Sequence, residues 1–135
     1  MIMRSLIIGA GLLLGLAAQA LAAPTQAQVD SGRRLFARCA GCHDVGPGAR
    51  NGFGPHLNAV LGRKAGSVAG YAYSPALSNS RLVWNEQNLV AFIRDSEKVV
   101  PGNKMRFLSF LSEKQVTDIV AYLRVHGVAA HPPKR

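Results

Sequence analysis

The chain has few cysteines, few acidic residues and no long apolar segment. Its 135 residues include two cysteines, which excludes a four-cysteine zinc site, and its histidines lack the spacing of a zinc finger. Seven acidic residues stand against 16 lysines and arginines, giving a formal charge of +9. The longest apolar run covers only about 13 residues (6–18), whereas a membrane span needs roughly 20. No repeat, strand alternation or hairpin signal is present, which favours a helical chain.

Both cysteines lie in one short segment, Cys39-Ala40-Gly41-Cys42-His43. Two cysteines separated by two residues, with histidine directly after the second, form the attachment motif of a c-type haem. Each thiol can add across one vinyl group of the porphyrin, so that two thioether bonds form. His43 then lies at axial distance from the iron. The motif therefore predicts one covalently attached haem.

Other uses of this motif fit less well. A thioredoxin-like redox pair is expected in a βαβ context, and no strand pattern flanks Cys39. A structural disulfide between Cys39 and Cys42 would leave His43 without a role.

The N-terminus has the pattern of a secretory signal peptide. Arg4 is the only charge before the apolar run, and Ala20-Leu21-Ala22 is a small–x–small cleavage site. We expect a signal peptide over residues 1–22 and one domain over 23–135, with its core at about 29–127. The alternative is an uncleaved anchor that tethers the domain to the inner membrane.

The positive charge of the mature chain predicts acidic partners. Removal of residues 1–22 takes away only Arg4, so the formal charge falls from +9 to +8. Basic residues cluster at 33–38 and again at Lys104 and Arg106. Such clusters steer a protein toward acidic docking faces, although solubility alone could also explain them. Nucleic acid is not an expected partner, because the exported chain has no aromatic-basic binding motif.

Capping and turn residues predict the helices. Asp30 or Ser31 should begin a helix that ends near residue 38, after a flexible segment at 23–28. Residues 44–73 are rich in glycine and lack periodicity. Helices are then expected at about 75–79, 86–96 and 113–126, because Ser74, Asn85 and Ser112 are N-cap residues and Gly127 is a stop signal.

Met105 is the only methionine left after signal cleavage. It lies in an irregular segment that follows Pro101-Gly102. A lone methionine can fill a core gap, or it can be the second axial ligand of a haem. His43 together with Met105 would give a closed iron with a raised potential, which suits electron transfer. The rival ligands are His56, His126, His131 and Lys104.

An ordered set of motifs resembles class I cytochrome c, close to the mitochondrial type and its short bacterial relatives. The resemblance runs from about residue 32 to 123. It implies an all-α cytochrome c fold, with three main helices, short helices and long loops around one covalently bound haem c. The motifs are Cys39-Ala40-Gly41-Cys42-His43, Gly54-Pro55-His56-Leu57, Leu61-Gly62-Arg63-Lys64, Tyr71-Ala72-Tyr73, Trp84, Pro101-Gly102-Asn103-Lys104-Met105 and Ala121-Tyr122-Leu123.

The resemblance implies roles for individual residues. Met105 should join His43 as an axial ligand, and the Pro55 carbonyl should accept a hydrogen bond from the far nitrogen of the His43 ring. Phe107 should pack beside the exposed haem edge near Met105. Phe36 should meet Tyr122 where the first and last helices cross.

Three further residues should neutralise or hydrogen-bond the buried haem propionates. They are Arg63, Tyr73 and Trp84. Their ordinary alternatives are a surface arginine and two core aromatic residues, but a buried propionate is costly unless it is paired.

Some positions depart from the family pattern. A threonine is common where this chain has Asn103, and a lysine of the mitochondrial docking face is replaced by Glu97. The docking face is therefore expected to be less basic than in the mitochondrial proteins.

The resemblance implies a periplasmic one-electron carrier rather than an enzyme. Its expected partners are redox proteins with acidic faces: a cytochrome bc complex or a dehydrogenase as donor, and a terminal oxidase or reductase as acceptor. We expect a monomer that contacts membranes only through these partners, unless the signal is retained. The alternatives are a dedicated haem subunit of a dehydrogenase or oxidase complex and, third, a ligand-binding or peroxidatic haem protein.

Overall fold

The computed structural model describes residues 22–107 and 110–127. In these residues the chain forms five helices, and the only extended pairing is an isolated bridge between Lys64 and Val83. The all-α expectation with three main helices is confirmed. The signal peptide expected over residues 1–22 lies outside the described residues except for Ala22. The helices are α1 (Gln26–Phe36), α2 (Pro75–Ser78), α3 (Glu86–Arg94), α4 (Ser96–Val99) and α5 (Glu113–His126).

None of the helices in the described ranges combines the length and apolar character needed to cross a membrane.

Side-chain caps begin the helices, mostly where the sequence predicts them. Ser112 and Gln115 form a capping box at α5, and the side chains of Asn85 and Ser74 cap α3 and α2. The start expected for α1 at residue 30 or 31 is wrong: Thr25 caps this helix through a box with Gln28, so part of the expected flexible segment is helical. The helix expected to end near residue 96 also stops earlier, and α4 follows it as a separate turn.

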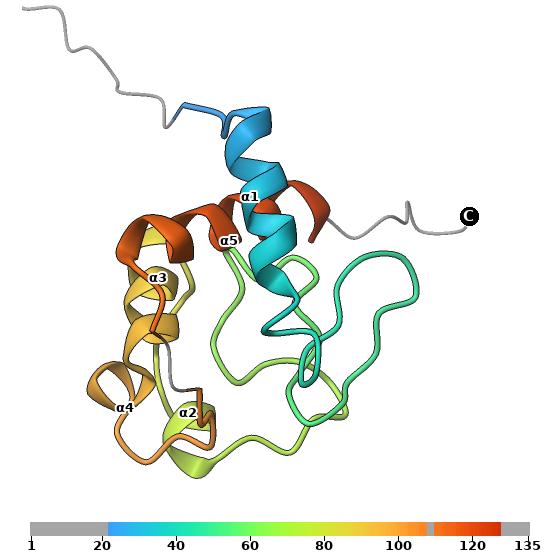
Figure 1. Cartoon of the computed structure of the whole chain (residues 1–135). Helices are drawn as coiled ribbons and strands as arrows, with labels where there is room; N and C mark the ends of the chain where they lie inside the picture. The colour runs from blue at the N-terminus through green and yellow to red at the C-terminus, as the bar shows by residue number, and fades with distance from the viewer. Residues whose placement is uncertain (1–21, 108–109, 128–135) are drawn as a thin grey trace, which may run out of the picture.

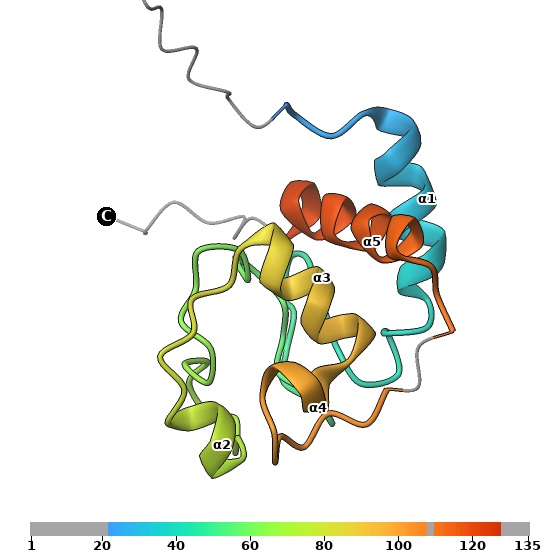
Figure 2. The same ribbon diagram turned by 90° about the vertical axis from the view of Figure 1, so that its left-hand side faces the viewer.

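The first and last helices cross at one end of the molecule. α1 packs on α5, α3 also lies against α5, and α2 and α4 lie toward the opposite end (Figures 1 and 2). The rings of Phe36 and Tyr122 meet at this crossing with centroids 5.4 Å apart, as expected. The buried core runs along α3 and α5, where its members include Leu89, Phe92, Val116, Ile119, Val120 and Leu123.

A buried carboxylate ties α1 to α5. Asp118 is only 1% exposed, and its Oδ2 accepts hydrogen bonds from the Ser31 hydroxyl at 2.7 Å and from the Lys114 ammonium at 2.9 Å. Its Oδ1 is buried and has no hydrogen-bond partner among the residues that the structure describes. Because a buried charge is costly unless it is well partnered, the Ser31 hydroxyl matters more than an ordinary surface hydroxyl.

Ser31→Ala should therefore destabilise the haem-loaded protein by about 2 kcal/mol, the scale of a hydrogen bond to a charged group. Ser67→Ala is the matched control, because the Ser67 hydroxyl donates only to the exposed carbonyl of Lys64. It should change stability by less than about 0.5 kcal/mol. Urea denaturation at pH 7 measures the free energy of unfolding of both variants. If Ser31→Ala lowered it no more than Ser67→Ala does, the Ser31 hydroxyl would contribute nothing to the α1–α5 contact.

Candidate haem site

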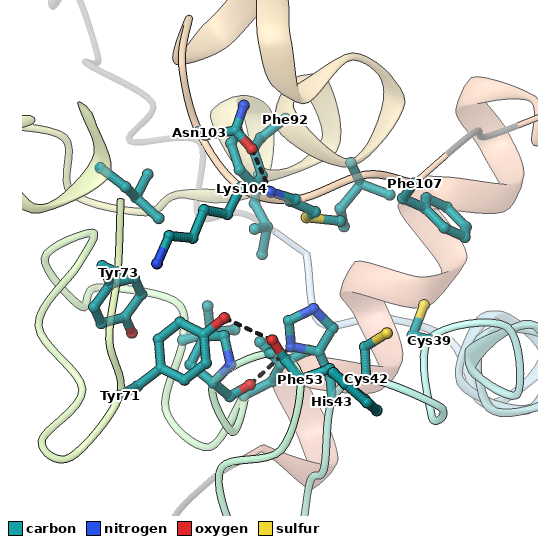
Figure 3. A pocket seen from close by; sticks show the side chains of 18 of the residues that line it. Cys39, Cys42, His43, Phe53, Tyr71, Tyr73, Phe92, Asn103, Lys104 and Phe107 are labelled. Carbon is teal, nitrogen blue, oxygen red and sulfur yellow. Dashed lines mark hydrogen bonds between the residues drawn. The ribbon is translucent and has the colours of Figure 1, made fainter. Parts of the chain in front are cut away.

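One cavity of about 430 Å³ opens among the residues between α1, the central loops and α3. This volume is within the roughly 300–1,000 Å³ of ordinary cofactor pockets. Its walls are mainly apolar, and Cys39, Cys42, His43 and Met105 all line it. Figure 3 shows Cys39, Cys42 and His43 on one side of the cavity, with Asn103, Lys104 and Phe107 on the facing side. The structure thus places the two expected axial ligands, His43 and Met105, on the wall of the same cavity as the two cysteines.

The turn after α1 presents both thiols and the imidazole. The backbone N–H of Cys39 donates to the Phe36 carbonyl at 2.8 Å, and that of His43 donates to the Cys39 carbonyl at 2.9 Å. Both thiols are free, and Cys42 is exposed while Cys39 is half-buried. Burial, and to a lesser extent the neighbouring Cys42, raises the pKa of Cys39 to about 11. The folded pocket therefore keeps this thiol protonated and does not itself activate it as a thiolate.

The His43 imidazole is fixed in one tautomer. Its Nδ1 lies 2.7 Å from the Pro55 carbonyl (Figure 3). Because a carbonyl can only accept, Nδ1 must carry the proton, which leaves Nε2 with a free lone pair. Burial lowers the pKa of His43, with the Pro55 hydrogen bond opposing this effect. A neutral imidazole with a free Nε2 is the form that binds a metal ion.

The residues expected to face the propionates all line the same cavity. Arg63 donates from its guanidinium to the carbonyls of Asn58 at 2.7 Å and His56 at 3.1 Å, and its other N–H groups have no acceptor in the described part of the chain. The Tyr73 hydroxyl accepts from the Val68 N–H at 3.3 Å, so its own proton is free to be donated. Burial raises the pKa of Tyr73 and keeps it protonated.

Trp84 is buried, and its indole N–H has no hydrogen bond to any of the described residues.

The charge of the cavity lining fits an anionic group. Four of the described lining residues are cationic (Arg38, Arg63, Lys104 and Arg106), and none of them is acidic. Burial lowers the pKa of Arg63, but an arginine guanidinium does not deprotonate at neutral pH and stays charged. Unused donors and unbalanced positive charge are the surroundings that a buried dicarboxylate such as a pair of haem propionates requires.

Met105 is half-buried on the cavity wall, and both of its backbone polar groups are bonded. Its N–H donates to Asn103 Oδ1 at 2.8 Å (Figure 3), and its carbonyl accepts from the Ser96 hydroxyl at 3.0 Å. Phe107 lines the cavity beside it.

The other candidates for the second axial ligand are less well placed for that role than Met105. Lys104 lines the cavity, but its ammonium donates to the Ala72 carbonyl at 3.0 Å. His56 is not among the residues that line the cavity, and His126 contacts Arg33 and Tyr122 near the end of α5. His131 lies outside the described residues.

The structure adds residues to which sequence reasoning gave no role at the site. Ser74 is buried on the cavity wall, where its hydroxyl caps α2 and keeps a free proton. Tyr71 donates to the Phe53 carbonyl at 2.6 Å and packs edge-on against Tyr73. Asn103 is 1% exposed and holds the backbone of Met105. The N-cap signal of Ser74 was readable in the sequence, but its position on the cavity was not.

These observations define a class: a small all-α protein with one mainly apolar, cation-lined cavity that two thiols, the His43 imidazole and the Met105 thioether all line. Comparison with known proteins makes the assignment specific. The sequence model of the family "Cytochrome c" matches residues 29–126. Cytochrome c2 of Blastochloris viridis is 42% identical over 123 residues, which cover 90% of this chain and 93% of that protein. Cytochrome c2 of Rhodoblastus acidophilus is 48% identical over 94 residues, which cover 70% and 88%.

A solved structure agrees with the sequence comparisons. Cytochrome cH from Methylobacterium extorquens superposes with a TM-score of 0.67 at 42% identity, covering 72% of this chain and 97% of that one. The chain belongs to the cytochrome c family. It is a monohaem electron carrier with one covalently attached haem c. It exchanges electrons with redox partners. Its cytochrome c2 relatives are electron carriers rather than enzymes.

Proposed function

We propose that this chain is a periplasmic one-electron carrier in which Cys39 and Cys42 hold the haem and His43 and Met105 are the axial ligands. The observation that carries this proposal is that all four side chains line the same cavity of about 430 Å³, with a neutral imidazole on one wall. The haem supplies the one-electron couple between ferric and ferrous iron. With His43 and Met105 both bound to the iron, no position would remain for a substrate, so these residues favour electron transfer over catalysis.

The polar residues of the cavity have supporting roles in this proposal. Pro55 orients the imidazole and increases its basicity through the Nδ1–H hydrogen bond. Arg63, Tyr73 and Trp84 would bind the propionates, and Phe107 would pack beside the haem edge near Met105. Arg38, Lys104 and Arg106 form a positive rim that favours a partner with an acidic face.

We further propose that residues 1–22 direct export and that cleavage after Ala22 releases the carrier to the periplasm. There it would accept electrons from a cytochrome bc complex or a dehydrogenase and pass them to a terminal oxidase or reductase. The cytochrome c2 relatives from bacteria and the signal pattern of the sequence support this proposal. Intact-mass analysis of the periplasmic fraction tests it, because the matured chain should begin at Ala23. Full-length protein in the membrane fraction would instead indicate an anchor.

The ligand set is tested by visible spectra of the protein matured in a host that attaches c-type haem. The oxidised protein should be low-spin and show the weak far-red band of ferric iron–thioether ligation, and carbon monoxide should leave the reduced spectrum unchanged. Met105→Ala should remove the band and allow carbon monoxide to bind. A high-spin wild-type spectrum, or ready binding of carbon monoxide, would contradict Met105 ligation and favour a ligand-binding or peroxidatic protein.

A further inference from the structure

Side-chain hydrogen bonds fix the backbone of the segment that carries Met105. Residues 100–107 contain no helix, and yet side chains bond to the backbone on both sides of Met105. Asn103 accepts from the Met105 N–H and donates to the Val100 carbonyl at 2.8 Å. Because Asn103 is buried, these contacts lie on the interior side of the segment.

A second set of contacts holds the same segment from the solvent side. The Glu97 carboxylate accepts from the Gly102 N–H at 3.0 Å. Arg106 donates to the Asn103 carbonyl at 2.7 Å and approaches the Met105 carbonyl at 3.4 Å. Glu97 therefore bonds the one residue of the segment with a left-handed backbone, since Gly102 has a φ of +82°.

The Glu97 carboxylate also lies 3.9 Å from Arg106, with both side chains more than half exposed. An exposed ion pair of this kind contributes little, so the attraction to Arg106 cannot be its main role. The hydrogen bond to the Gly102 amide is different, because a charged acceptor on a backbone N–H forms a stronger bond. The Glu97 carboxylate, which would make a docking face less basic, thus accepts a hydrogen bond from the backbone of the Met105 segment.

We propose that Glu97 is a positioning residue that keeps Met105 seated over the cavity and so controls the access of small ligands to the iron. This inference rests on the proposed role of Met105 as an axial ligand. An external ligand can reach that position only after the Met105 segment opens. Its apparent affinity therefore depends on the fraction of molecules with an open segment, and the Glu97–Gly102 hydrogen bond lowers that fraction.

Imidazole binding to the ferric holoprotein at pH 7 tests the proposal. Glu97→Ala removes the acceptor and should raise the apparent affinity for imidazole about tenfold, the effect of losing one charge-assisted hydrogen bond. Glu97→Gln keeps an oxygen that can accept from Gly102 but loses the charge, so its affinity should stay within about threefold of wild type. Amide hydrogen exchange at Gly102 provides a readout independent of the iron and should accelerate in Glu97→Ala.

Glu113→Ala is the matched control. It removes an equal charge from an exposed ion pair with Arg94, and Glu113 does not line the cavity. Its imidazole affinity should equal that of wild type. If Glu97→Ala behaves like Glu113→Ala while the wild type shows the far-red thioether band, the inference about Glu97 is wrong and the ligand assignment stands. If the wild type lacks that band, the Met105 assignment itself fails, and the inference fails with it.

Discussion

Gly32→Ala should lower the melting temperature of the holoprotein by about 10 °C or more, because it forces apart the helices that close the fold. A Cβ at this position would lie 2.6 Å from the carbonyl carbon of Asp118 and 2.8 Å from the Cβ of Tyr122. Both neighbours are held within α5, so the helix itself must move. Overpacking of this kind costs about 3 kcal/mol, and the better helix propensity of alanine returns only about 1 kcal/mol.

The control for Gly32 is Gly41→Ala. A Cβ at Gly41 would meet nothing within 4 Å, so this variant should melt within about 2 °C of wild type. Thermal unfolding followed by far-ultraviolet circular dichroism compares them. If both glycine variants melted together, the contact between α1 and α5 would be looser than the structure shows.

Local signals in the sequence were sufficient for most of the fold. The caps at Ser74, Asn85 and Ser112 each need only a side chain and the next few backbone amides, so their positions could be predicted without tertiary contacts. The start of α1 was also readable, because Thr25 and Gln28 have the spacing of a capping box. Asp30 and Ser31 are competing N-cap residues, so the local pattern alone does not favour Thr25 over them.

The site divides in the same physical way. Cys39, Cys42 and His43 are adjacent in sequence, so their chemistry could be inferred from the motif alone. By contrast, the packing of Gly54 on the His43 ring and the Glu97–Gly102 hydrogen bond depend on how the chain turns back on itself. No short sequence pattern predicts contacts of this kind. Glu97 in particular suggested only a less basic docking face, whereas the structure shows its carboxylate bonded to the loop of Met105.

The two walls of the cavity are held by different means. The imidazole wall is packed: Gly54 lies directly against the His43 ring, and the Pro55 carbonyl fixes its tautomer. The wall that carries Met105 belongs to a segment without helix. Asn103 and Glu97 accept hydrogen bonds from its backbone N–H groups, and Arg106 donates one to a backbone carbonyl. Loss of one hydrogen bond shifts an opening equilibrium, whereas a steric conflict at the packed wall has no small adjustment available. The larger effects are therefore expected on the His43 side.

Gly54→Ala tests that expectation. A Cβ at Gly54 would lie 2.6 Å from Nδ1 and 2.8 Å from Nε2 of His43, so the ring must leave its position and its hydrogen bond to Pro55. Partners that orient a metal-binding histidine contribute about 10–100-fold to metal affinity. We expect the variant to mature poorly, and the holoprotein that forms should contain high-spin iron and bind carbon monoxide when reduced.

Gly52→Ala provides the comparison for Gly54→Ala, because a Cβ there would approach only the Cys42 carbonyl oxygen, at 3.4 Å. That distance is an ordinary contact, so its spectrum and haem yield should match the wild type. Haem content per polypeptide and the ferric and ferrous spectra, with and without carbon monoxide, measure both variants. A low-spin Gly54→Ala protein with wild-type yield would mean that the His43 ring can move without losing the iron, and that Gly54 and Pro55 do not determine its position.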